Sequence, residues 1–153
     1  MQATTSGFDL AHHNIFFAED YAEEFDAIFR RRAIAAAPTV YVCAQDRGEA
    51  GGAVDGAPER LLALVNAPAD GDVAPLDAAA LTDLEDRTFG LLQDCGLLVN
   101  RRAEASVVTT PTGFHDLFPA TGGALYGPAV HGATATFKRP GSRTRVPGLY
   151  LGA

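Results

Sequence analysis

Short runs of apolar and aromatic residues, separated by polar stretches, predict most of the strands of this chain. Residues 12–18 (HHNIFFA), 39–45 (TVYVCAQ) and 60–67 (RLLALVNA) are compact and rich in β-branched or aromatic side chains, which is typical of strands. Residues 97–110 predict one or two more strands, most clearly at 105–110. Loops rich in glycine, proline and acidic residues lie between these runs, so the second and third runs are expected to pair.

Helical spacing of apolar residues predicts two longer helices and one short helix. Asp20 is expected to cap the first, with Glu23 completing a capping box. The apolar positions of this helix fall on one face, and they are Tyr21, Phe25, Ile28 and Phe29. The second helix covers residues 76–95 and ends before Gly96, which suits a helix C-terminus. Residues 111–118 predict the short helix.

The order of these elements predicts an α+β fold, with a mixed, mostly antiparallel sheet and two to three helices packed on one side. The 153 residues leave room for one domain, so residues 1–153 are expected to form a single unit. Hydrophobic residues make up 47% of the chain and charged residues 20%. This composition favours a packed core over disorder.

Charge and hydropathy exclude several classes of protein. The net charge of −7 and the shortness of the basic clusters speak against a nucleic-acid partner. The cluster Arg30–Arg32 closes the first helix, where cations complement the helix dipole; contact with lipid or a protein partner is the alternative. No run reaches the ~18 apolar residues of a membrane span, and residues 1–20 lack the regions of a secretory signal. A cytoplasmic location is therefore expected.

The sequence shows no recognisable catalytic or metal-binding set. It contains no serine nucleophile elbow and no cysteine beside an evident base, and Cys43 and Cys95 lack metal or redox spacing. Adjacent His12 and His13 are expected on opposite faces of a strand, where they would not share a metal ion. Acidic pairs such as Glu23–Glu24 are expected on solvated helix surfaces. We predict no metal site and can name no catalytic residue.

A glycine-rich stretch at residues 120–132 (ATGGALYGPAVHG) does not suit the interior of a helix or strand. It does not match the P-loop or the G-x-G-x-x-G fingerprint, so no self-contained nucleotide site is expected. Two interpretations stay open. Gly122 and Gly123 could let a flat ligand approach the backbone, bordered by Tyr126 and His131, or the stretch is a tight connection between elements.

Several segments, taken in order along nearly the whole chain, resemble one protein family. They are residues 12–17 (HHNIFF), the aromatic positions of 20–29, 38–47 (PTVYVCAQDR), 59–69 (ERLLALVNAPA), Phe114 with 117–127 (LFPATGGALYG), 131–132, 139–140 and 148–151 (GLYL). Together they resemble the C-terminal half of bacterial carotenoid desaturases of the phytoene desaturase family. The similarity is greatest to the branch of hydroxy- and methoxyneurosporene dehydrogenases, the 1-hydroxycarotenoid 3,4-desaturases.

This resemblance implies an oxidoreductase that uses FAD to desaturate carbon–carbon bonds of carotenoids. The family's N-terminal half carries a Rossmann FAD fingerprint, and its C-terminal end adds a second flavin contact. Neither stands in this sequence, so the chain is expected to be the substrate-binding portion, without tight FAD binding or activity of its own. The resemblance implies an apolar tunnel formed by residues 12–17 and 114–126. It further implies that Gly122, Gly123, Tyr126 and His131 bind the substrate.

The alternative to a piece of an enzyme is a non-catalytic module. Such a module would bind a carotenoid or another apolar ligand, or would dock onto a separate flavin-binding chain. In either case part of a two-unit protein should expose a large apolar face, through which the chain could also form a dimer. A lipid-soluble substrate would suit peripheral contact with the inner membrane.

Overall fold

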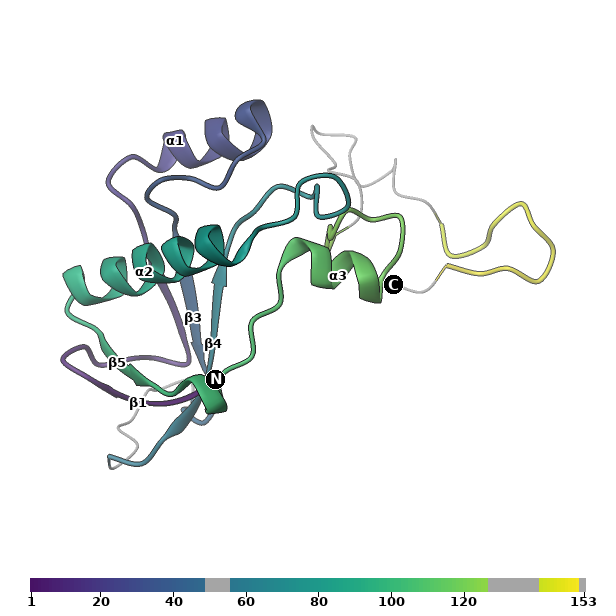
Figure 1. Cartoon of the computed structure of the whole chain (residues 1–153). Helices are drawn as coiled ribbons and strands as arrows, with labels where there is room; N and C mark the ends of the chain where they lie inside the picture. The colour runs from purple at the N-terminus through teal and green to yellow at the C-terminus, as the bar shows by residue number, and fades with distance from the viewer. Residues whose placement is uncertain (49–55, 127–140, 152–153) are drawn as a thin grey trace.

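The computed structural model describes residues 1–48, 56–126 and 141–151. Within these residues five strands form one sheet in the order β2–β3–β4–β1–β5, and every pair is antiparallel (Figure 1). The strands are β1 (Gln2–Ser6), β2 (His13–Phe16), β3 (Val40–Ala44), β4 (Glu59–Val65) and β5 (Leu98–Arg101). The predicted α+β class and the antiparallel sheet are confirmed.

Helices form in all three predicted regions, together with one 3₁₀ turn that was not predicted. They are α1 (Tyr21–Phe25), its π-helical continuation η1 (Asp26–Arg31), α2 (Ala78–Asp94), the 3₁₀ turn η2 (Ala103–Ala105) and α3 (Pro111–Leu117). Asp20 caps α1 by accepting the backbone N–H of Glu23 at 3.1 Å, and Asp77 caps α2 in the same way through Ala80 at 2.7 Å. Gly96 follows α2 with a φ of +88°. None of the helices in the described residues is long and apolar enough to cross a membrane.

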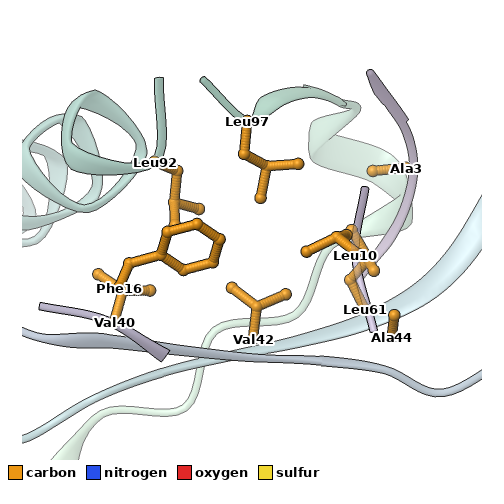
Figure 2. Close-up of a cluster of buried hydrophobic side chains, with 9 residues drawn as sticks. All are labelled: Ala3, Leu10, Phe16, Val40, Val42, Ala44, Leu61, Leu92 and Leu97. Atoms are coloured by element: carbon orange, nitrogen blue, oxygen red, sulfur yellow. The ribbon is translucent and has the colours of Figure 1, made fainter. Parts of the chain in front are cut away.

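The hydrophobic core lies between one face of the sheet and α2 (Figures 1 and 2). Side chains alternate along β3, so Val40, Val42 and Ala44 point into this core, while Tyr41 and Cys43 face the other side of the sheet. Nine buried side chains form the cluster, and they are Ala3, Leu10, Phe16, Val40, Val42, Ala44, Leu61, Leu92 and Leu97. Helix α2 covers this core, and its own residue Leu92 is fully buried there.

The predicted strands at 12–18, 39–45 and 60–67 are confirmed as β2, β3 and β4, but two strand assignments differ. The expected strand at 105–110 is wrong, because residues 106–110 are extended chain and Val107 is 87% exposed. High β-propensity does not make a strand where no neighbouring strand supplies hydrogen bonds. Conversely, β1 is polar and was not predicted, yet it pairs with both β4 and β5.

A buried ion pair joins several segments on the β1 side of the sheet. Arg47 donates from Nε and Nη2 to the two carboxylate oxygens of Glu59, at 2.8 and 2.7 Å. Its guanidinium also donates to the Leu10 carbonyl and the Thr5 hydroxyl, at 2.9 and 3.0 Å. The hydrogen bonds that Glu59 accepts, first those from Arg47 and then one from the Thr5 hydroxyl at 2.7 Å, hold the pKa of Glu59 below its ordinary value against the opposing effect of burial. The pair therefore fixes β1, β4 and the turn after β3 together.

Candidate functional site

The predicted glycine site is a tight junction between loops. The carbonyl of Gly122 accepts the backbone N–H of Gly71 at 2.9 Å, and the Gly122 N–H donates to Nδ1 of His115 at 3.2 Å. A Cβ at Gly122 would lie 2.5 Å from the carbonyl oxygen of Ala69, and one at Gly123 would lie 2.3 Å from that of Pro111. The close backbone approach at these glycines is therefore made by the chain itself.

The two other predicted substrate contacts are Tyr126 and His131. Tyr126 is 89% exposed, and His131 lies outside the described residues. The geometry favours the interpretation of a tight connection. Substrate binding by Gly122, Gly123, Tyr126 and His131 stays a prediction.

An apolar groove of about 390 Å³ lies elsewhere, between the α1–η1 helix and the segment that follows β4. Its lining comes from Tyr21, Glu24, Phe25, Ile28, Phe29, Arg32 and residues 66–69. None of these residues belongs to the predicted tunnel segments 12–17 and 114–126. The periodicity of the first helix was correctly predicted, but its apolar face borders this groove instead of the core.

A row of four aromatic rings runs along the groove and extends beyond it. Phe17, Tyr21, Phe25 and Phe29 follow one another at spacings of four residues, with ring centroids 5.2, 5.0 and 6.1 Å apart. Each of these rings is 44–73% exposed. We call this set the aromatic row. A contiguous exposed apolar surface of this kind is typical of a binding site for an apolar ligand or partner.

Glu24 is the one carboxylate in the groove lining, and it is 2% exposed. Its Oε1 accepts hydrogen bonds from the backbone N–H of Thr39 and from Nδ2 of Asn66, each at 3.3 Å. Its Oε2 has no partner among the described residues. The expectation of a solvated Glu23–Glu24 pair is thus wrong for Glu24, because this residue lies on the inner side of α1. An unpaired buried acceptor is costly and favours a ligand that donates a hydrogen bond.

The arginines that close this helix pair with nearby acids. Arg30 lies 3.3 Å from Asp26, Arg31 pairs with Glu23, and Arg32 lies 3.5 Å from Asp70. Arg32 also donates to the carbonyl of Ala69 at 3.3 Å, across one end of the groove. These contacts support the structural interpretation of the Arg30–Arg32 cluster.

A second polar cluster lies where β2 and β3 pair. His12, His13 and Cys43 each place one ligand atom within 4.8 Å of the others, and the two imidazole rings are 4.4 Å apart, edge to face. Nε2 of His12 lies 3.6 Å from Sγ of Cys43. The expectations of opposite faces and of no base beside a cysteine are therefore wrong. His12 precedes the first residue of β2, so strand alternation does not govern its side chain.

Comparison with known proteins gives the family relationship. No family model matches the chain. The hydroxyneurosporene desaturase of Rubrivivax gelatinosus is 54% identical over 151 residues, which is 99% of this chain. The chain is homologous to part of a carotenoid desaturase. The hydroxyneurosporene desaturase of Cereibacter sphaeroides is 41% identical over 97% of the chain, and the 1-hydroxycarotenoid 3,4-desaturase of a Flavobacterium species is 29% identical over 90%.

The resemblance read from the sequence is confirmed by these relatives. The chain spans 28–29% of the length of the three desaturases. Their similarity covers the strands and helices that build both the groove and the His12–His13–Cys43 cluster, because the match extends over nearly the whole chain.

Proposed function

We propose that this chain is the substrate-binding part of an FAD-dependent carotenoid desaturase and that the polyene lies in the groove beside α1. The observation that carries this proposal is the combination of an apolar groove with the aromatic row that continues it. A polyene is long, flat and apolar, and it gains about 25 cal/mol for each Å² of apolar surface removed from water. A volume of about 390 Å³ suits one end of such a molecule.

Glu24 supplies the polar recognition in this proposal. The relatives are named for hydroxylated carotenoids, and a substrate hydroxyl reaching Glu24 would donate to the unpaired Oε2. This hydrogen bond would discriminate strongly against a carotenoid without the hydroxyl, since that ligand would leave the buried carboxylate unpaired. Asn66 holds the carboxylate in place through Oε1.

In this proposal the flavin is bound by another part of the same protein. Desaturation removes a hydride and a proton, and a flavin supplies the hydride acceptor that side chains lack. Among the described residues, Gly122 and Gly123 do not fit that cofactor, because the backbone of Ala69 and Pro111 occupies the space beside them. We therefore derive no step through FAD here. Peripheral contact of the whole protein with a membrane would deliver the apolar substrate.

The second candidate is a non-catalytic module that docks onto a flavin-binding chain. The face of the sheet opposite the core supports it, because Ile15 on β2 and Leu62 and Leu64 on β4 lie there, on either side of β3, and are 36–56% exposed. A partner chain or a second copy of this chain would cover these side chains. The two candidates share the groove and differ in where the flavin is bound.

Carotenoid binding to the purified chain tests the groove. Phe25→Ala is expected to weaken binding of a hydroxylated carotenoid about tenfold, because it removes a ring that belongs to both the groove and the aromatic row. Dissociation constants would be measured from the visible spectrum of the bound carotenoid during titration in detergent.

The matched control is Tyr150→Ala, because Tyr150 is 68% exposed and lies outside both the groove and the predicted tunnel segments. It is expected to bind as the wild type does. Equal affinities of the Phe25 variant and the wild type would contradict the location of the site. Equal affinities of the wild type for carotenoids with and without the hydroxyl would contradict the role of Glu24.

A further inference from the structure

The His12–His13–Cys43 cluster combines histidine and cysteine, the two side-chain types most used to bind zinc. The separation of 3.6 Å between Nε2 of His12 and Sγ of Cys43 matches two ligands of one tetrahedral ion. Bond lengths of about 2.3 Å to sulfur and about 2.0 Å to nitrogen give a separation of about 3.5 Å at a tetrahedral angle. All three ligand atoms lie within 4.8 Å of one another, so small side-chain rotations bring them to one ion.

A hydrogen bond at Nδ1 orients each of the two histidines. Nδ1 of His12 lies 2.7 Å from the carbonyl oxygen of Arg47, so Nδ1 carries the proton and donates it. Nε2 of His12 then carries a free lone pair, which faces Sγ of Cys43. Nδ1 of His13 lies 2.7 Å from the hydroxyl of Tyr41. A backbone or side-chain partner on the second nitrogen is the usual arrangement of metal-binding histidines.

The backbone around the cluster is well fixed. Cys43 is buried in the middle of the sheet, and His13 is its direct register partner across the β2–β3 ladder. The carbonyl that orients His12 belongs to Arg47, whose side chain is locked by Glu59. His13 and Cys43 on paired strands, together with the adjoining His12, are therefore held close to the positions that a metal ion needs.

We propose that His12, His13 and Cys43 bind one Zn²⁺ ion, with water in the fourth position. The ion would cross-link β2 and β3. A thiolate with two imidazoles favours Zn²⁺ over Mg²⁺ or Ca²⁺, which prefer oxygen ligands. A fourth, exchangeable position is consistent with the exposure of His13 to solvent. This inference stands on the cluster alone and is independent of the groove and its ligand.

The test uses Co²⁺ as a spectroscopic probe for the proposed site. The full chain is freed of metal with a chelator, kept reduced and titrated with Co²⁺. We expect a thiolate-to-cobalt charge-transfer band in the near ultraviolet and visible bands of tetrahedral cobalt, saturating at one ion per chain. Added Zn²⁺ should displace the cobalt and raise the thermal midpoint, because it binds the folded chain.

Matched variants locate the ion. Cys43→Ser should abolish the charge-transfer band, whereas Cys95→Ser should keep it, since Cys95 is the exposed cysteine at the end of α2. His13→Ala should weaken Co²⁺ binding by at least about tenfold, and its exposed position should leave the fold intact by circular dichroism. His115→Ala is the control for loss of a histidine away from the cluster.

Several outcomes would overturn the proposal. The absence of a charge-transfer band in the wild-type chain would mean that His12 and Cys43 are only a hydrogen-bonded pair. Loss of the band in Cys95→Ser, or its persistence in Cys43→Ser, would place the metal on the exposed thiol. Wild-type affinity in His13→Ala would also count against the site.

Discussion

Replacing Glu59 with glutamine is expected to destabilise the chain by about 3–5 kcal/mol. The substitution keeps the shape of the side chain but leaves the buried guanidinium of Arg47 with only the solvent-exposed carboxylate of Asp9, 3.6 Å from Nη1. Both side chains of the Arg47–Glu59 pair are at most 6% exposed, so water cannot solvate the guanidinium once the carboxylate is gone. The measurement is urea unfolding of the purified chain followed by circular dichroism, where the midpoint should fall while the m-value is unchanged.

The control is Glu104→Gln, which breaks the ion pair between Glu104 and Arg102. That pair is 65–71% exposed, and exposed pairs contribute little to stability. The control should therefore unfold at the wild-type midpoint. A midpoint for Glu59→Gln that equals the wild-type value would show that the buried pair does not hold the sheet together.

Glu59 should also affect how the free energy of unfolding falls at acidic pH. Because folding lowers the pKa of Glu59, its contribution is fully present above its ordinary pKa of 4.5 and is lost as the pH falls through the lower, folded-state value. Stability of the wild type should decline over this acidic range. Glu59→Gln cannot titrate here, so its decline should be shallower.

Local patterns in the sequence predicted the elements that depend on residues near one another in the chain, such as a capped helix or a strand with an apolar run. The cap at Asp20 and the strands β2, β3 and β4 were read from the order of the residues alone. β1 could not be found in this way, because its sequence QATTS is polar and its position depends on distant partners in β4 and β5. Its attachment through Thr5 to the Arg47–Glu59 pair explains why a polar strand is held there.

The candidate sites were harder to predict, since they depend on residues that are distant in the sequence. Helical periodicity identified the apolar face of α1, but the same pattern serves a core and a ligand groove equally well. Cys43 meets His12 only because β2 and β3 pair in one register. The spacing of 31 residues between them matches no short metal motif. The resemblance to carotenoid desaturases did find the relatives of this chain, because it uses whole segments instead of spacing.

Gly123→Ala is expected to release α3 from the loop that contains Gly71. Gly123 has a φ of +89°, a conformation that costs an L-residue roughly 1–2 kcal/mol. The new Cβ would lie 2.3 Å from the carbonyl oxygen of Pro111, the first residue of α3, so the helix must move. No residue of α3 is buried, so the expected result is local opening. Hydrogen exchange measured by mass spectrometry should become much faster in Pro111–Leu117 than in the wild type.

The control is Gly90→Ala, because Gly90 lies within α2 with open space around its Cα. This variant should gain about 0.5–1 kcal/mol from helix propensity and should leave α3 exchange unchanged. The comparison also decides between the two interpretations of the glycine stretch. If Gly123 serves a tight connection, Gly123→Ala accelerates exchange in α3 and leaves carotenoid affinity at the wild-type value. If Gly123 lines the substrate instead, affinity falls while exchange in α3 is unchanged, and the junction described above is not its function.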